Sequence, residues 1–498
     1  MISTRILPIA ANGDRLQIGD VHETNSPRLG CNLEETLRNG KTRASQDCET
    51  LSQAKHPQLS DQRRASTLSR SWLCRKNGHS LGRQPVSPPS PSRKLSHEHH
   101  MRHSAIPLQT VSTGIVVAIV GFFSSFPIVL QGLNGMRASK AEAASGLMAA
   151  AIAMGLAGVV LSLRTKIPVS VAWSTPGVAL LAVSKMPEAG FAEAVGAFLF
   201  AGLLTTIAGF WRPLSRLIAA IPAPLAQAML SAVLLSICLQ PFSAMSQAPW
   251  VALPVIVTWF IAGQINRMIA VPCAVVVAAL VVVFQPGFDF TLNGSSVIPA
   301  PVFTVPVFSL PSLIGIGLPL FVVTMATQNI PGLAIIRSFG YHPAPAPLIS
   351  SVGGASLISA PFGAPATCLA AITAAMCAND DSHPDPGKRY LSAVFGGLFY
   401  CLFGLFAGII TAFAGLAPPM LLGTLAGVAL LPVFATSALA AFEDTSYRQA
   451  ASITFLVTAS GVTIIGLSAA VWGLVLGGIV QVINTRMTRD THGASRNT

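Results

Sequence analysis

The sequence predicts an all-α polytopic membrane protein with about fourteen transmembrane segments, arranged as two inverted repeats of seven. Three observations predict this fold class: the composition, the charges between apolar segments, and a pair of short, broken segments. Of the 498 residues, 52% are hydrophobic and only 10% are charged, whereas a soluble domain carries about 25% charged residues. The apolar runs are long and continuous and do not alternate at every second residue, which favours helices over a β-barrel.

Apolar segments bounded by charged residues, Pro and Gly follow one another from Ser112 onward. We place them at 112–133, 142–163, 169–185, 191–211, 222–240, 249–265, 268–285, 311–330, 345–359, 365–378, 390–414, 418–441, 449–467 and 468–486. With a cytoplasmic N-terminus, twelve Lys and Arg side chains fall at inner ends, and only Arg137, Lys140 and Lys185 fall at outer ends. Such a bias is typical of membrane proteins. It predicts cytoplasmic termini and explains the net charge of +12 without a nucleic-acid partner.

The third and tenth segments are short and rich in Pro, Gly and Ser. They read IPVSVAWSTPGVALLA (167–182) and ISAPFGAPATCLAA (358–371), and superimposing Pro176 on Pro365 also aligns Trp173 with Phe362. Each is the third member of a set of seven segments. Because seven is odd, the second set enters the membrane from the opposite side, which is the pattern of an inverted repeat.

Pro176 and Pro365 are predicted to break the two segments and to begin half-helices, since Pro lacks an N–H and has a helical φ. The irregular backbone before each break is tolerated at membrane depth only inside protein or beside a cavity. Two half-helix N-termini facing the membrane midplane would offer free N–H groups and partial positive charge to an anion. The alternative is two Pro-kinked helices packed for shape.

Polar residues near these breaks are candidate ligands. The eighth segment ends in Thr324, Thr327, Gln328 and Asn329, and the first segment places Ser124, Ser125 and Gln131 in the equivalent position. Polar side chains in lipid are costly, so they mark either a substrate wall or interhelical hydrogen bonds. Trp173 and Phe362 are suited to stack on an aromatic ring or to pack in the interior. No carboxylate lies plainly mid-membrane, since Glu142 and Glu193 begin segments, so the proton carrier stays unassigned.

The loop NDDSHPDPGKRY (379–390) raises the possibility of a membrane prenyltransferase, whose Mg²⁺–diphosphate site uses two acidic clusters. A second cluster is absent from the sequence, which favours a solvated inner loop. The cysteines form no CxxC pair, and no Walker A motif occurs. We therefore expect no metal and no cofactor.

Residues 1–100 hold 15 of the 31 Lys and Arg residues and no apolar run of membrane length. Their Ser-, Pro- and Gln-rich composition predicts a disordered cytoplasmic extension. The alternative is a start assigned too early, because Met101 opens an ordinary membrane protein. A transporter domain is expected over 101–488, followed by a tail at 489–498.

Four stretches resemble the benzoate:proton symporter family. They read ATQNIPGLAIIRSFGY (326–341), APFGAPATCLAAITAA (360–375), HPDPGKRY (383–390) and ITFLVTASGVTIIG (453–466). The resemblance covers about 101–488, and its TQNIPG and HPDP-x-x-R-Y stretches are fairly specific. The family is similar in architecture to uracil and SLC26-type carriers.

The resemblance implies an elevator-like carrier in a bacterial inner membrane, with a core domain (112–211 and 311–414) and a gate domain (222–285 and 418–486). It implies a substrate site between the two half-helices, carried over to Ser125, Trp173, Ser174, Thr175, Gln328, Asn329, Gly363, Ala364 and Thr367. The expected function is proton-coupled uptake of benzoate or a similar small aromatic carboxylate, without enzymatic activity. The alternatives are a nucleobase or an inorganic anion carried by the same fold. Gly- and Ala-rich gate faces would permit a homodimer.

Overall fold

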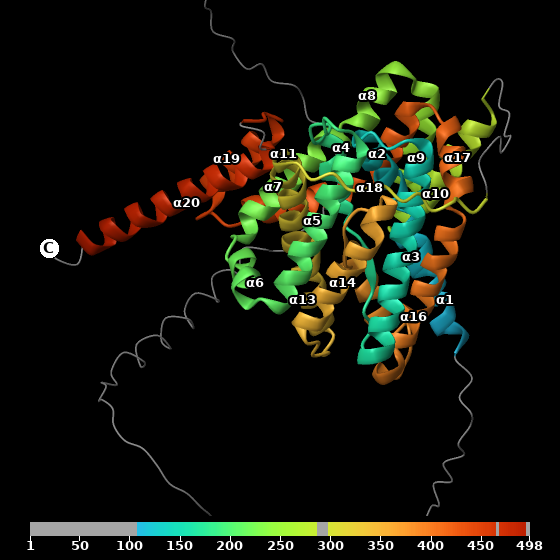
Figure 1. Ribbon diagram of the computed structural model, residues 1–498, viewed down its shortest axis with the longest axis horizontal. Helices are drawn as coiled ribbons and strands as arrows, with labels where there is room; N and C mark the ends of the chain where they lie inside the picture. Colours follow the sequence, from blue (N-terminus) through green and yellow to red (C-terminus); the bar gives the residue numbers. More distant parts are fainter. Residues whose placement is uncertain (1–106, 286–296, 465–467, 495–498) are drawn as a thin grey trace, which may run out of the picture. The chain divides into compact units, whose positions relative to one another are not determined.

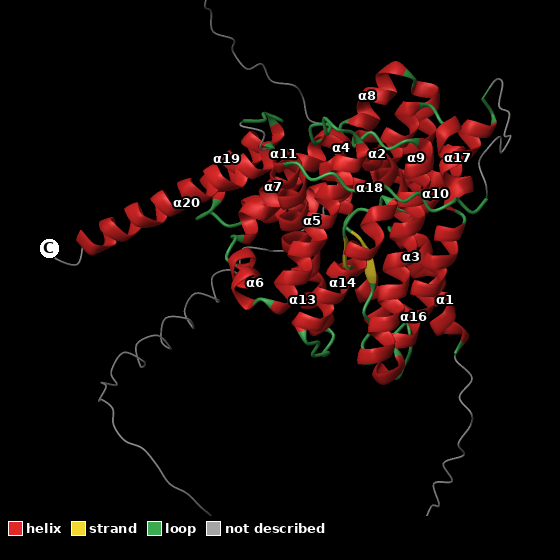
Figure 2. Ribbon diagram, in the orientation of Figure 1, coloured by secondary structure: helices red, strands yellow, loops and turns green. Residues whose placement is uncertain are grey.

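The computed structural model describes residues 107–285, 297–464 and 468–494, which belong to the compact unit that begins at residue 98. The predicted extension at 1–100 lies outside the described residues. Helices make up most of the described chain, with one small pair of strands among them (Figures 1 and 2). This agrees with the predicted all-α class.

The first half of the chain contains ten helices and one strand within the described residues. They are α1 (Leu108–Phe123), α2 (Phe126–Gly135), α3 (Lys140–Thr165), β1 (Val171–Trp173), α4 (Thr175–Val183), α5 (Phe191–Phe210), α6 (Arg212–Ala219), α7 (Ala223–Cys238), α8 (Gln240–Gln247), α9 (Pro249–Ile265) and α10 (Ala270–Val283).

The second half repeats this order with more irregular helices. Its elements are α11 (Leu310–Ser312), η1 (Leu313–Gly317), α12 (Leu318–Thr324), η2 (Met325–Asn329), α13 (Ile330–Ser338), α14 (Pro345–Ser359), η3 (Ala360–Phe362), β2 (Thr367–Leu369), α15 (Ala371–Ala378), η4 (Pro386–Lys388), α16 (Tyr390–Leu405), α17 (Ala407–Leu416), α18 (Pro419–Phe442), α19 (Arg448–Ala459) and α20 (Ala469–Ala494). The turns η1 and η2 are π-helical. Helix α20 continues into the region that the sequence predicts as a tail.

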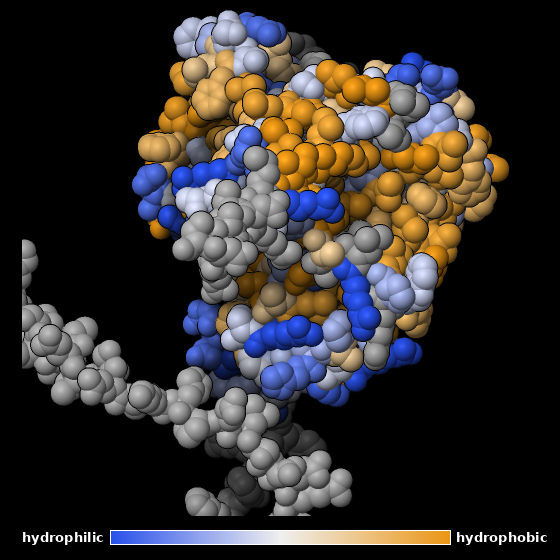
Figure 3. Space-filling model, turned by 90° about the vertical axis from the view of Figure 1, so that its left-hand side faces the viewer, coloured by the Kyte–Doolittle hydropathy of each residue, from blue (hydrophilic) through white to orange (hydrophobic). Residues whose placement is uncertain are grey.

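Every predicted apolar segment contains a helix in the structure. In the described part of the chain, seven helices are long and apolar enough to cross a membrane singly, or up to eight if the bent pair 386–405 and 407–416 is one span. The other segments are shorter or broken. On the face in Figure 3, hydrophobic side chains cover a broad area, and hydrophilic side chains gather at the lower end, with smaller groups at the upper edge, at the left edge and beside the grey atoms. This distribution suits a protein whose middle faces lipid.

Small residues let α3 and α16 approach closely, as is common between helices in lipid. A Cβ atom on Gly397 of α16 would lie 2.6 Å from the carbonyl oxygen of Gly155 on α3 and 2.8 Å from the Val159 side chain. Backbone atoms cannot move aside as a flexible side chain can. The two helices therefore depend on glycine at this crossing.

Gly397→Ala is expected to lower the thermal stability of the purified protein, because overpacking costs about 1–3 kcal/mol. Gly354→Ala in α14 is the matched control, since its added Cβ meets no atom within 4 Å and Ala favours a helix. Thermal unfolding in detergent would compare the two variants. Equal midpoints for both would contradict the close α3–α16 packing.

Candidate functional site

The two broken segments meet in a short antiparallel strand pair. Strand β1 pairs with β2 so that Val171 faces Leu369 and Trp173 faces Thr367. Two backbone hydrogen bonds extend the pairing, from Ser174 N–H to the Ala366 oxygen at 2.8 Å and from Ala370 N–H to the Ser170 oxygen at 3.0 Å. Because the strands run in opposite directions, α4 and α15 leave the pair at opposite ends. The predicted relation between the third and tenth segments is thus present in the structure.

The N-terminus of α4 is closed by its own residues. The Ser174 hydroxyl accepts a hydrogen bond from Gly177 N–H at 3.2 Å and another from the Thr324 hydroxyl at 2.8 Å. Pro176 lies in the first turn, as predicted, and has no N–H to offer. Only the N–H of Thr175 is left in this turn without an acceptor among the described residues.

The N-terminus of α15 is open. Ala370 precedes the helix in extended conformation and provides no side-chain cap. The N–H groups of Ala371, Ile372 and Thr373 find no acceptor in the described part of the chain. Free N–H groups at a helix start attract anions, so the capacity to hold an anion is unequal between the half-helices and lies mainly at α15.

Pro365 does not begin the second half-helix, so this prediction was wrong. It lies in the loop before β2, and α15 begins six residues later at Ala371. Gly363, at φ +86°, and Ala364 belong to the same loop, where Gly363 lies against Gly146 of α3. Phe362 contacts Phe303 edge-on, with ring centroids 5.9 Å apart. Residues 370–373 give no local signal of a helix start, because the residue before the helix is Ala370, which has no capping side chain, and no Pro follows it.

Asn329 and Gln328 have different roles although they are adjacent. Asn329 is fully buried, and its amide oxygen accepts the N–H of Leu369 at 2.9 Å while its amide nitrogen contacts the Met325 sulfur at 3.3 Å. It therefore fixes the strand that leads into α15. Gln328 is half-buried, and its amide makes no hydrogen bond to any described residue. Its donors and acceptor are free for a ligand.

Ser125 and Trp173 are fully engaged with each other. The Trp173 side chain is 1% exposed, and its indole N–H donates to the Ser125 hydroxyl at 2.8 Å. That hydroxyl donates in turn to the Gly121 oxygen at 2.9 Å, and the indole meets Phe122 edge-on at 5.4 Å. The pair joins β1 to the break between α1 and α2. In this conformation the indole has no open face for a substrate ring.

Thr367 is also buried among protein groups. Its hydroxyl lies 2.9 Å from the Val352 oxygen and 2.7 Å from the Ser356 hydroxyl, which accepts the N–H of Thr367 at 2.8 Å. These bonds hold β2 against α14. Thr367 thus positions the strand pair.

The acidic loop at 379–390 is tied to the other end of α15. Arg389 is 7% exposed, and its guanidinium donates to the oxygens of Ala378 and His383 at 2.9 Å and to the Asp380 carboxylate. A cation at a helix C-terminus is favourable. Tyr341 donates to the Pro386 oxygen at 2.9 Å, and burial raises the pKa of this phenol despite the opposing effect of Arg389. Arg389 of the HPDPGKRY stretch (383–390) therefore caps the C-terminus of α15.

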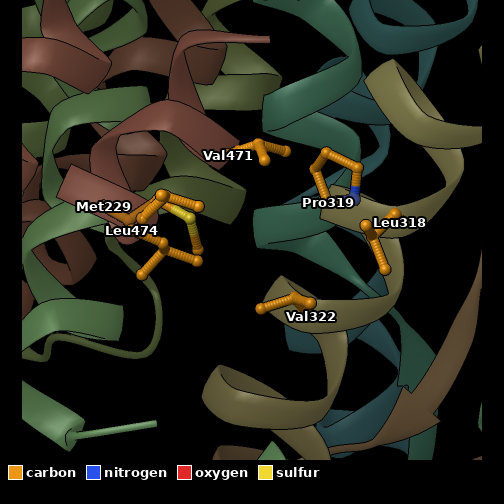
Figure 4. A pocket seen from close by; sticks show the side chains of 7 residues that line it. Met229, Leu318, Pro319, Val322, Val471 and Leu474 are labelled. Carbon is orange, nitrogen blue, oxygen red and sulfur yellow. The ribbon is translucent and has the colours of Figure 1, made fainter. Parts of the chain in front are cut away.

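A wholly apolar cavity of about 130 Å³ is lined on one side by the long helical segment that also carries Gln328 (Figure 4). Leu318, Pro319 and Val322 of α12 form one side. Met229 of α7 and Val471, Leu474 and Val475 of α20 complete the lining. The volume is close to that of an engineered apolar cavity of about 150 Å³ that binds benzene.

Paired half-helices inside a bundle of apolar helices are an architecture of membrane carriers, and solved structures share this fold. The fold resembles the transmembrane domain of the cyanobacterial bicarbonate transporter BicA, with a TM-score of 0.50 and 17% identity over 76% of this chain and 96% of that one. It also resembles SLC26A9, with a TM-score of 0.52 and 14% identity over 76% of this chain and 66% of that one. These likenesses confirm the predicted fold class.

Sequence relatives narrow the class. Residues 104–483 match the family model described as benzoate membrane transport protein. The inner membrane protein YdcO of Escherichia coli is 36% identical over 77% of this chain and 97% of its own length. The benzoate membrane transport protein of Acinetobacter baylyi is 31% identical over 76% of this chain and 95% of its own. The chain belongs to the benzoate membrane transport protein family.

Proposed function

We propose that this transporter carries benzoate or a similar small aromatic carboxylate, together with protons, across a bacterial inner membrane by alternating access. The observation that carries the proposal is the open N-terminus of α15. Asn329 binds the strand before this helix, and the adjacent Gln328 amide has no hydrogen-bond partner among the described residues. The family and the name of the Acinetobacter relative support the substrate class.

The carboxylate would accept hydrogen bonds from the free N–H groups at 371–373. Hydrogen bonds to a charged group are worth about 1.5–3 kcal/mol each, so a lysine or arginine is not required. Gln328 would add donors, whereas the N–H of Thr175 lies at the opposite end of the strand pair. Ser174, Asn329, Thr367 and the Ser125–Trp173 pair would hold the half-helices in place, and Gly363 and Ala364 would shape the loop before β2.

The aromatic ring needs an apolar neighbour, and the cavity against Val322 offers one of suitable size. Val322 and Gln328 lie within two turns of the segment 310–338. A ring in this cavity would gain roughly 25 cal/mol for each Å² of apolar surface removed from water. This favours an aromatic acid over a small hydrated anion.

Alternating access would use the two sets of helices that the sequence groups as core and gate. Support comes from the packing, in which α3 contacts α16 and α5 contacts α14 on one side, while α7 contacts α18 and α19 on the other. Movement of one set against the other would expose the half-helices to each side in turn. Cytoplasmic termini and a homodimer are part of this proposal.

The test is uptake of labelled benzoate by the purified protein in liposomes, with and without an inward proton gradient. We expect protein-dependent uptake that rises with the gradient and that substituted benzoates inhibit. Empty liposomes are the control for diffusion of the neutral acid. Uptake no faster than in empty liposomes would refute the proposed substrate.

An inorganic anion is the second candidate, because the fold resembles a bicarbonate transporter. The uncharged donors at α15 can bind any small anion, whereas the apolar cavity would contribute nothing to the binding of an inorganic anion. Bicarbonate that competes with labelled benzoate as well as substituted benzoates do would favour this candidate.

A further inference from the structure

A second cavity, also of about 130 Å³, surrounds a buried carboxylate at the start of α5. Glu193, Ser309, Ser312, Thr463 and Ser468 are among the residues that line it. Exposed Lys185 and Glu188 also line it, so the cavity reaches the surface. The positive-inside pattern assigns this end of the segments to the outside.

Glu193 is 5% exposed and is held only by neutral donors. One carboxylate oxygen accepts hydrogen bonds from the hydroxyls of Ser309 and of Ser312, the latter at 2.6 Å. The other oxygen accepts the N–H of Ala189 at 2.8 Å. No cation pairs with Glu193 within the described residues. The cavity's Lys185 pairs instead with Glu188 at 3.6 Å.

Arg137 is a further cation near the cavity, since its guanidinium donates to the sulfur of Met186 at 3.3 Å and Met186 lines the cavity. Segments 303–324, 345–364 and 460–464 contain no Asp, Glu, Lys, Arg or His. Arg212 and Arg216 of α6 follow the opposite end of α5. Lys185 and Glu188, 67% and 88% exposed at their side chains, are therefore the titratable groups that share its cavity.

The two cavities follow each other along the same pair of elements. Ser312 and Gly315 line the outer cavity, and Pro319 and Val322 line the apolar one, at spacings of three or four residues. Such spacings place residues on one face of an α-helix, and here the π-helical turn 313–317 lies between Ser312 and Pro319. Across from them, Ser468 lines the outer cavity while Val471 and Val475 line the apolar one. The residues that line the two cavities thus follow one another along the same two segments, and Gln328 comes six residues after Val322 on the first of them.

We propose that Glu193 binds the cotransported proton when the outer cavity closes against Thr463 and Ser468. This inference rests on the proposed function, since it assigns the proton of that transport cycle. In the open cavity, water and the two serines solvate the carboxylate. Closure removes water and disfavours the charged form, so the carboxylate takes one proton from the outer solution and becomes a neutral carboxyl group.

Protonation of Glu193 has two consequences after closure: the carboxyl O–H can bond to Ser468, and the repulsion between Glu193 and an anionic substrate is removed. The Ser468 hydroxyl oxygen is buried without a hydrogen-bond partner among the described residues, and it can accept the carboxyl O–H. Neutral Glu193 also no longer repels a carboxylate substrate that passes it, because like charges disfavour each other at short range. One proton would therefore accompany each anion.

The test compares Glu193→Gln with wild type in two liposome assays: uptake driven by a proton gradient, and exchange of labelled for unlabelled benzoate without a gradient. Gln keeps the shape and an acceptor oxygen but cannot take up the proton. We expect exchange within about twofold of wild type and loss of the stimulation by the gradient. Glu188→Gln, at the exposed rim, should behave as wild type.

Ser312→Ala is a second variant that keeps Glu193 in place. It removes one donor to the charged carboxylate, which favours the protonated form. The external pH of half-maximal uptake is expected to rise by about one pH unit. Stimulation of Glu193→Gln by the gradient as in wild type, or an unchanged pH profile in Ser312→Ala, would overturn the assignment. No uptake by wild type would instead refute the proposed substrate.

Discussion

Ala371→Pro is expected to weaken benzoate transport more than any other single change outside the packed core. Pro at the first position of a helix is compatible with helix geometry, and Ala370 before it is already extended, with φ −101° and ψ 119°. The substitution therefore removes one free N–H from α15 without breaking the helix. Loss of one hydrogen bond to a carboxylate, about 1.5–3 kcal/mol, predicts a roughly ten- to hundredfold rise in the apparent KM for benzoate.

Ala371→Gly is the matched control, because it keeps the N–H and removes only a methyl group. Concentration-dependent uptake in liposomes would give the KM of both variants, and thermal unfolding would show whether they fold equally well. A normal KM in a folded Ala371→Pro variant would remove the α15 N-terminus from the site.

Gln328→Ala is the second large effect that we expect. The Gln328 amide has no hydrogen-bond partner among the described residues, so its removal leaves no protein group unsatisfied and should not affect stability. A lost hydrogen bond to a carboxylate predicts a rise in KM of about ten-fold or more. The result would contrast with Asn329, whose loss would leave the buried N–H of Leu369 without an acceptor.

Gln264→Ala, the same substitution at an exposed position near the end of α9, controls for general effects of the change. Uptake and thermal unfolding would be measured for both Gln variants. Normal uptake by Gln328→Ala would exclude the amide from substrate contact. Reduced stability of this variant would reveal a structural role instead.

Local sequence patterns predicted the helices well. Predicted segments 249–265 and 345–359 coincide with α9 and α14, because long apolar runs bounded by Pro and polar residues suffice to define helices in lipid. Pro176 correctly indicated the first half-helix, since Pro favours a helix start.

Long-range features were beyond local patterns. The register of Trp173 opposite Thr367 depends on pairing between residues far apart in the chain, and it places the second half-helix at Ala371, not at Pro365. Gln328 and Asn329 look alike in the sequence. Only the fold brings Asn329 to Leu369 and leaves the Gln328 amide free. The sequence places Glu193 only at the start of a segment. Its burial depends on Ser309 and Ser312, which follow more than a hundred residues later.

The open start of α15 has a consequence for how this protein can diverge. Its donors are main-chain amides, which every residue except proline supplies, so alanine scanning would pass over them and random substitution would rarely remove them. Recognition of a negative charge would thus persist while substitutions change the side chains that line the rest of the site. New substrates would be acquired through side chains such as Met229, Val322 and Gln328, which adjust the shape around an anion that the backbone continues to hold.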